Sequence, residues 1–174
     1  MLTLSLFRHA KSSWDEEPLK DLDRPLSERG LAAAPTMGTY LAREGLRPDC
    51  VLSSPSVRTR KTAALAFKAF ASPPEIQFED ALYLASHKTL LARIKRVDAR
   101  IQHLMILGHN PGLHALALDL IADGAQKLIA ELADKLPTAG LVVLEFDARE
   151  WADVAAGTGR LAVFTSPRKL MPEK

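Results

Sequence analysis

The chain has 174 residues, of which 47% are hydrophobic and 25% are charged, so it can form one ordinary globular core. Its formal net charge of +2 is too small by itself to indicate nucleic acid or a membrane surface as a partner. A single cysteine, Cys50, excludes an intrachain disulfide, and its apolar neighbours favour a buried thiol over a nucleophile. The apolar start, 1–7, is too short for a secretory signal, and no apolar run reaches the ~20 residues of a membrane-spanning helix. We therefore expect one cytoplasmic domain over residues 1–174.

Strand and helix patterns alternate from the first residue. In chain order they predict a strand over 1–7, a charged loop over 11–25, a helix over 27–44, a strand over 50–53, a helix over 55–70 and a strand over 76–78. Ser27 is typical of a helix N-cap, and Gly45 is typical of a helix end. Pro35 inside the first helix predicts either a kink or a later start.

The second half continues the alternation. Ser86 is a candidate cap for a helix whose apolar side chains fall on one face. Beyond it the patterns predict a buried strand over 104–107, helices over 112–122 and 125–135, and strands over 141–146 and 161–165. Strands that alternate with helices over most of the length indicate an α/β domain, a three-layer α/β/α sandwich around a mostly parallel central sheet.

Polar clusters follow three of the predicted strands. Arg8 and His9 end the first strand, Ser54 ends the second with Arg58 one turn into the next helix, and His109 follows the strand over 104–107. Because the carboxyl ends of parallel strands lie at one edge of a sheet, and ligands bind there, we expect these distant residues to converge.

The chemistry of this set suits a phosphoryl group. Two guanidinium groups, from Arg8 and Arg58, offer planar, permanently charged donors that match phosphate oxygens. A neutral imidazole can act as a nucleophile, and nearby arginine charge disfavours its protonated form. The second imidazole, of His109, can donate to the oxygens during transfer. Taken singly, each motif also fits a solvated loop, an exposed helix face or a turn. No acidic cluster with metal-ligand spacing accompanies the set, so we expect the Arg–His set to do the work usually given to Mg²⁺.

The ordered motifs resemble those of the histidine phosphatase superfamily, and in particular its short, SixA-type phosphohistidine phosphatase branch. The resemblance lies in Leu6-Phe7-Arg8-His9-Ala10-Lys11-Ser12, in Asp23-Arg24-Pro25-Leu26-Ser27-Glu28-Arg29-Gly30, in Ser53-Ser54-Pro55 with Arg58 and Thr62, and in Leu107-Gly108-His109-Asn110-Pro111. It covers Leu2 to about Gly112, and the late strands fit the remainder of the family's phosphoglycerate mutase-like fold.

The resemblance implies that His9 is the phosphorylated nucleophile and that Arg8, Arg58 and His109 surround the phosphate. It implies a phosphatase that needs no metal and no organic cofactor. Two positions depart from the larger sugar-phosphate members. Ala10 replaces their Gly, as it commonly does in the short branch, and Asp15 lies near their phosphate-binding Asn. A carboxylate there repels a dianion, so we expect Asp15 to be a solvated loop charge or to bind a substrate cation.

A general acid is harder to identify from the sequence. Glu79 and Asp80, just after the strand over 76–78, are candidates, although both also fit exposed loop positions. A sugar alkoxide needs a positioned proton donor, whereas the imidazole of phosphohistidine leaves more easily. The short connection between the Arg58 helix and the Gly108 strand leaves little chain for a lid, which favours an open pocket and a phosphorylated protein.

We therefore expect a metal-independent phosphatase that acts on phosphohistidine in proteins. Within catalysis, the alternatives are a small-molecule phosphomonoesterase and a phosphomutase, of which the mutase is disfavoured because it must shield its phosphoenzyme from water. An alternative of a different class is a non-catalytic phosphoprotein-binding module, which needs the arginines but not His9. Nucleic acid is a distant possibility, since the basic stretch 93–100 has no interleaved aromatic residues.

Overall fold

The computed structural model describes residues 1–14 and 19–171. The strands are β1 (Leu2–Arg8), β2 (Cys50–Ser53), β3 (Glu75–Phe78), β4 (His103–Gly108), β5 (Ile121–Gly124), β6 (Leu141–Phe146) and β7 (Gly159–Thr165). The helices are α1 (Glu28–Arg43), α2 (Val57–Ala66), α3 (His87–Ile94), α4 (Gly112–Leu120), α5 (Gln126–Asp134) and α6 (Pro167–Leu170). Short 3-10 turns are η1 (Asp21–Asp23), η2 (Phe67–Ala69), η3 (Asp80–Leu82) and η4 (Trp151–Asp153). Within the described ranges, no helix is long and apolar enough to cross a membrane.

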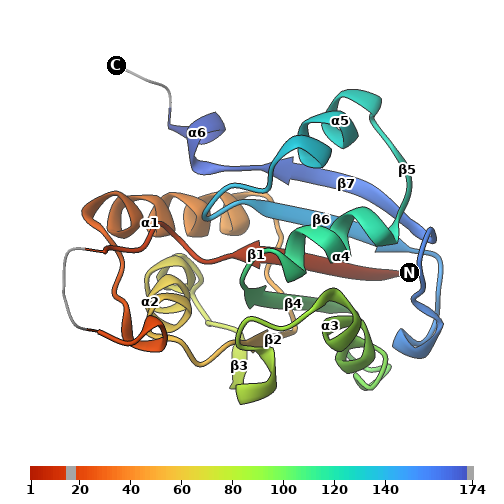
Figure 1. The fold of residues 1–174 in the computed structure, drawn as a ribbon. Coiled ribbons are helices and arrows are strands. Elements are labelled where there is room, and N and C mark those ends of the chain that lie inside the picture. The colour runs from red at the N-terminus through yellow and green to blue at the C-terminus, as the bar shows by residue number, and fades with distance from the viewer. Residues whose placement is uncertain (15–18, 172–174) are drawn as a thin grey trace.

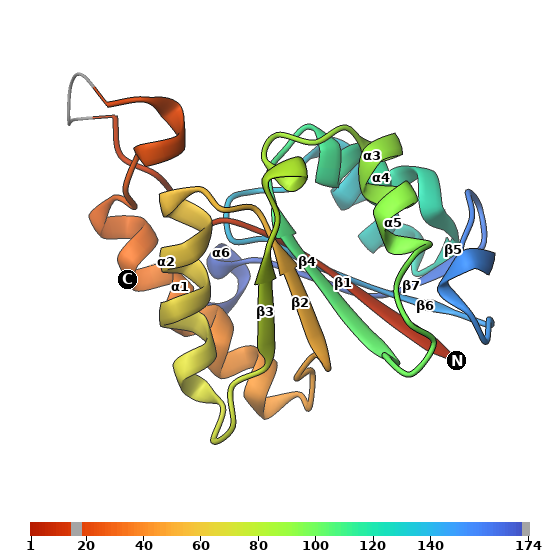
Figure 2. The same cartoon turned by 90° about the horizontal axis from the view of Figure 1, so that it is seen from below.

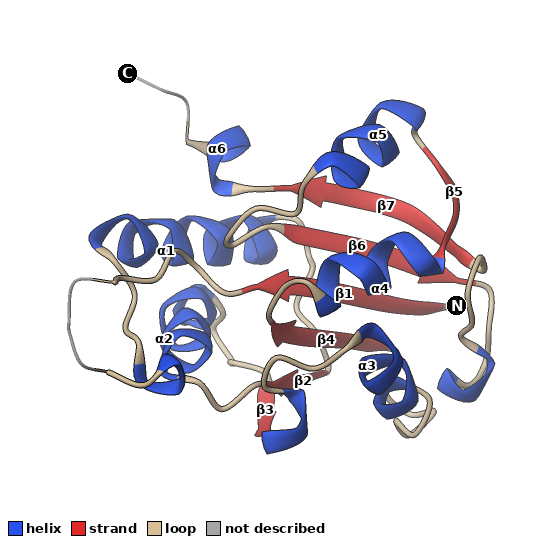
Figure 3. Cartoon of the chain, in the orientation of Figure 1, coloured by secondary structure: helices blue, strands red, loops and turns tan. Residues whose placement is uncertain are grey.

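One sheet, in the order β3-β2-β4-β1-β6-β7-β5, forms the centre of the molecule (Figures 1 and 3). Parallel pairing joins β1 to β4, β4 to β2 and β2 to β3, whereas β6 pairs antiparallel with both β1 and β7. The mostly parallel sheet expected from the sequence is therefore confirmed. Its consequence is that β1, β2, β3 and β4 all end at the same edge.

Helices cover both faces of the sheet. Seen from below, α1, α2 and α6 lie on one side, and α3, α4 and α5 lie on the other (Figure 2). Side chains along each strand point alternately to these two faces. Leu104 and Ile106 pack into the core beneath α3 and α4, whereas Met105 and Leu107 pack beneath α1 and α2. Two apolar layers on one sheet make the α/β/α sandwich that the sequence predicts.

Helix α1 begins where the sequence predicts. The Ser27 side chain accepts a hydrogen bond from the backbone N–H of Gly30 and so caps the helix. Gly30 has a second role, because a Cβ there would lie 2.1 Å from the carbonyl oxygen of Lys11. The later start considered for Pro35 is wrong. Pro35 lies within a continuous helix whose buried face, which includes Met37, packs on the sheet.

The second half departs from the prediction at one boundary. The helix expected over 112–122 ends at Leu120, and the chain then forms β5, which pairs in parallel with β7. A four-residue edge strand that contains Asp123 and Gly124 has no alternating pattern long enough to reveal it. Helix α6 is likewise a single turn without a sequence period of its own.

Candidate active site

The four residues expected to converge line one pocket of about 180 Å³. Arg8, His9, Arg58 and His109 contribute to its walls, and the ring centroids of the two histidines are 5.2 Å apart. The pocket lies where β1, β2 and β4 end. Residues up to 100 positions apart in the chain are therefore brought together by parallel pairing, as the sequence indicated.

The backbone of His9 is fixed on both sides. Its N–H donates to the carbonyl of Gly108 across 3.1 Å, and its own carbonyl accepts from the N–H of Ala139 across 2.8 Å. The next N–H, of Ala10, donates to the Thr62 hydroxyl across 3.0 Å, and that hydroxyl donates to the carbonyl of Arg58 across 2.7 Å. These bonds join the end of β1 to the end of β4 and to the helix that carries Arg58.

Hydrogen bonding sets the tautomer of the His9 ring. Nδ1 lies 2.7 Å from the carbonyl oxygen of Ala10, and because a carbonyl only accepts, Nδ1 carries the proton. Nε2 therefore keeps a lone pair, and within the described chain it has no hydrogen-bond partner. Burial, with the nearby charges of His109, Arg58 and Arg8, lowers the pKa of His9 to about 3, against the opposing effect of the Ala10 bond. The ring is thus neutral throughout the physiological pH range, the form in which an imidazole can act as a nucleophile.

The His109 ring has the opposite tautomer. Its Nε2 lies 2.7 Å from the Ser54 hydroxyl, and its Nδ1 lies 3.3 Å from Nη2 of Arg58. Since a guanidinium only donates, Nδ1 accepts and Nε2 carries the proton. Burial and the charge of Arg58 lower the pKa of His109 to about 4. In this arrangement both nitrogens are engaged, so donation from His109 to a phosphate requires a change of its hydrogen bonds.

Arg8 offers a buried donor to the pocket. Its Nη1 donates to the carbonyl of Leu136 across 3.1 Å, while its Nε is buried and has no hydrogen-bond partner among the described residues. Burial and the charge of Arg58 lower the pKa of the guanidinium. Buried donors in proteins are nearly always paired, so an anion in the pocket fits this position. Asn110 donates to the same carbonyl across 2.9 Å and steadies the loop that ends α5.

Asp21, a residue that the sequence reasoning did not single out, holds Arg58 in place. The guanidinium donates to the Asp21 carboxylate across 2.9 Å and to its backbone carbonyl across 2.6 Å. Arg24 and the Tyr83 hydroxyl donate to the same carboxylate. Burial opposes ionisation of Asp21, but the bonds from Tyr83, Arg58 and Arg24 outweigh it and lower the pKa to about 2. A negative charge therefore lies beside Arg58 at neutral pH.

Part of the pocket wall comes from the segment between β1 and α1. The Arg24 guanidinium lies 3.1 Å from the centre of the Trp14 ring, which is 69% exposed, and Arg24 also donates to the Ser12 hydroxyl across 2.5 Å. Arg24 belongs to a motif that the sequence reasoning quoted, although no role was given to it. Asp15 lies outside the described residues.

The two candidate general acids are not brought to the pocket. Glu79 forms a bidentate ion pair with Arg93 of α3, at 2.8 and 2.9 Å, which lowers the pKa of its carboxyl. A carboxyl held ionised by an arginine is a poor proton donor. Asp80 begins η3 and is exposed, and it does not line the pocket. In the described parts of the chain, no group of three or more His, Cys, Asp or Glu side chains could hold a metal ion.

The motifs and the fold have known counterparts. Residues 4–83 match the model of the histidine phosphatase superfamily, branch 1. A Mycobacterium tuberculosis protein described as uncharacterized is 36% identical over 163 residues, which cover 92% of this chain and 99% of that protein. The crystal structure of SixA from Agrobacterium tumefaciens, a candidate phosphohistidine phosphatase, is 32% identical and has a TM-score of 0.80 over 95% of this chain and 98% of that one. The protein histidine phosphatase SixA complexed with tungstate is 18% identical, with a TM-score of 0.77 over 97% and 99% of the two chains.

Proposed function

The chain belongs to the SixA-type branch of the histidine phosphatase superfamily, and from that premise we propose that it removes phosphoryl groups from phosphohistidine in proteins, with His9 as the nucleophile. It is a phosphatase with the phosphoglycerate mutase-like α/β/α fold of its relatives. The observation that carries the proposal is the state of the His9 ring, which donates from Nδ1–H to the Ala10 carbonyl and keeps the Nε2 lone pair, in a pocket lined by Arg8, Arg24 and Arg58.

His9, Arg8 and Arg58 each have a part in the proposed reaction. Nε2 of His9 attacks phosphorus, a new P–N bond forms, and the P–N bond to the substrate imidazole breaks while that imidazole takes a proton from water. Positive charge then develops on the His9 ring, which strengthens the bond from Nδ1–H to the Ala10 carbonyl. Arg8 and Arg58 balance the charge on the phosphoryl oxygens. A water molecule next hydrolyses the phosphorylated His9, releases inorganic phosphate and restores the neutral ring.

The position of Glu79 supports phosphohistidine as the substrate. Because Arg93 holds this carboxylate ionised, Glu79, one of the two sequence candidates, is not available to protonate an alkoxide. An imidazole leaving group makes less demand on a protein acid than a sugar alkoxide does. The phosphohistidine assignment and the similarity to SixA proteins therefore agree. The cytoplasmic location expected from the sequence stays a prediction.

Metal-free turnover tests the nucleophile. We expect the wild type to hydrolyse p-nitrophenyl phosphate in the presence of a chelator, and His9→Ala to lose activity by about 10³-fold or more. His87→Ala, at the start of α3 and outside the pocket, is the matched control and keeps its activity. Undiminished turnover in His9→Ala would overturn the assignment of His9 as the nucleophile. A substrate panel then tests the donor, since a strong preference for sugar phosphates over a phosphohistidine protein would overturn the phosphohistidine assignment.

A further inference from the structure

A groove of about 610 Å³ leads away from the candidate active site. It shares Arg8, Lys11 and Thr138 with the catalytic pocket, so the two cavities adjoin. Its walls come from the segment after β1, from α1, from the end of α5 with the following loop, and from the β7–α6 connection. A substrate with its phosphoryl group beside His9 can therefore continue into this groove.

The lining of the groove is strongly basic. Six lysine and arginine residues face two carboxylates, whereas the excess of positive over negative charge in the whole chain is only two. Lys169 is neutralised by Glu131 at 2.6 Å. Among the described residues, Lys11, Arg29, Lys135 and Arg168 form no ion pair, and all four are exposed. Positive side chains therefore outnumber negative ones at the approach to the candidate active site, where Asp134 is the carboxylate other than Glu131.

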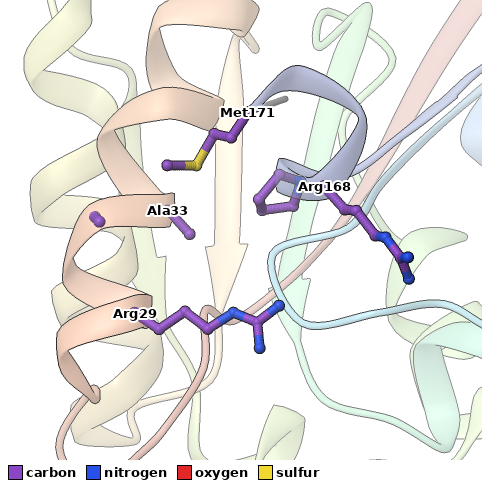
Figure 4. A pocket seen from close by; sticks show the side chains of 6 residues that line it. Arg29, Ala33, Arg168 and Met171 are labelled. Carbon is purple, nitrogen blue, oxygen red and sulfur yellow. The ribbon is translucent and has the colours of Figure 1, made fainter. Parts of the chain in front are cut away.

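The groove extends into a cleft of about 370 Å³ between α1 and α6. Arg29 and Arg168 line both cavities, and Met171 closes the outer part of the cleft. Figure 4 shows the Arg29 side chain extending from α1 toward α6, the Arg168 side chain pointing away from α1, and Met171 at the end of the cleft opposite Arg29.

We propose that this groove binds an acidic polypeptide segment next to the phosphohistidine of a substrate protein, through Arg29, Arg168, Lys11 and Lys135. The proposal rests on the proposed function for its substrate class. Unpaired, exposed cations along a groove attract Asp and Glu side chains, and the charge speeds encounter as well as stabilising the complex. A single-stranded nucleic acid fits less well, because among the described residues that line the groove the only aromatic one, Phe164, is buried and cannot stack on bases.

Two phosphohistidine peptides of one length test the groove, one with Asp and Glu beside the phosphohistidine and one with Asn and Gln at the same positions. For the wild type we expect a KM about tenfold lower for the acidic peptide, the size of effect that two or three exposed ion pairs give. The difference should disappear at 1 M salt, where charges are screened within about 3 Å. Arg29→Glu/Arg168→Glu should abolish the preference and leave hydrolysis of p-nitrophenyl phosphate unchanged.

The control variant is Lys68→Glu/Lys95→Glu, which makes the same charge change after the ends of α2 and α3, at exposed positions outside the groove. It should keep the preference for the acidic peptide. Equal KM values for the two peptides in the wild type, or a preference that survives in Arg29→Glu/Arg168→Glu, would overturn the groove proposal.

A binding measurement separates the groove from the proposed function. If the wild type hydrolyses p-nitrophenyl phosphate but neither peptide, the phosphohistidine assignment fails. Fluorescence anisotropy of the labelled acidic peptide without its phosphoryl group then tests whether the groove binds an acidic segment. Binding that is about tenfold weaker in Arg29→Glu/Arg168→Glu supports it. Equal binding by both proteins, or tighter binding of an oligothymidine strand than of the acidic peptide, overturns it.

Discussion

The guanidinium of Arg58 donates to the carboxylate of Asp21 across 2.9 Å, so an arginine of the phosphate pocket already has an anionic partner within the chain. The side chain of Arg58 is only 4% exposed, whereas that of Asp21 is 41% exposed. The pair therefore orients the buried arginine from the surface side. A phosphoryl group that approaches Arg58 meets a hydrogen-bond donor that is already held in position. It also meets the negative charge of Asp21.

We expect Asp21→Asn to bind inorganic phosphate more tightly than the wild type. Removal of one negative charge near Arg58 is worth about 1 kcal/mol in a partly exposed site, which corresponds to roughly fivefold in affinity. The inhibition constant of phosphate against p-nitrophenyl phosphate measures this change. Asp23→Asn, an exposed residue of the same short turn, is the control and should leave the constant unchanged. Weaker phosphate inhibition in Asp21→Asn would show instead that orientation of Arg58 outweighs repulsion.

Stability should fall as the pH is lowered from 7 toward 5. His9 and His109 have pKa values of about 3 and 4 in the folded protein, whereas an unfolded histidine titrates near 6.5. Below about pH 6.5 the unfolded chain therefore binds protons that the folded chain does not. Each such histidine contributes up to about 1.4 kcal/mol per pH unit to the loss. The low pKa of Asp21 acts only as the pH falls through the unfolded value of 3.8, so it lies outside this window.

Urea unfolding at several pH values measures this slope. His9→Ala should show a shallower dependence on pH, by up to about 1.4 kcal/mol per unit, because one neutral buried histidine is gone. A free energy of unfolding that is constant between pH 7 and 5 would contradict the buried, neutral state of both rings. An unchanged slope in His9→Ala would contradict it for His9 alone.

Glu79→Gln should leave catalysis intact and lower stability slightly. The ion pair of Glu79 with Arg93 is partly exposed, so its loss costs about 0.5–1 kcal/mol of unfolding free energy. Because Glu79 does not line the pocket, kcat should stay within about twofold of the wild type, far from the 10²-fold loss that removal of a general acid brings. Asp80→Asn serves as the neighbouring control. A large fall in kcat with an unchanged KM in Glu79→Gln would restore this residue as the proton donor.

Gly30→Ala should destabilise the protein although alanine favours helices. Its Cβ would lie 2.1 Å from the carbonyl oxygen of Lys11, so α1 or the segment after β1 must shift. We expect a loss of about 2–4 kcal/mol in urea unfolding, against the ~1 kcal/mol that the helix propensity of alanine would add. Ala32→Gly, at an exposed position of the same helix, should cost only ~1 kcal/mol. A Gly30→Ala protein as stable as the wild type would mean that the two segments separate easily.

The sequence predicted the part of the site that strand ends and family motifs define. Arg8, His9 and His109 are each next to a strand, so parallel pairing was enough to bring them together. Asp21 could not be found in this way, because it lies in an irregular loop and its importance comes from contacts with Arg58 and Tyr83. Such contacts depend on the path of a loop, for which hydrophobic periodicity gives no information.

The same limit explains why the pairing of Glu79 with Arg93 and the basic groove could not be predicted from the sequence. Glu79 follows a strand at the catalytic edge, which made it a reasonable candidate, but its partner Arg93 is on a helix 14 residues later, and sequence position does not reveal their pairing. The cations of the groove are dispersed from Arg8 to Lys169, so no local charge run indicates them. Only the fold brings them to one surface.

The backbone hydrogen bonds around His9 also determine which unfolding motion can disrupt the site. Its amide donates to Gly108 within the sheet, and the amide of Ala10 donates to Thr62 of α2, so both protons are held between core elements. Hydrogen exchange at these two positions should require separation of those elements rather than the local fraying of a loop. The position of His9, the proposed nucleophile, is thus kept for as long as the central sheet stays folded.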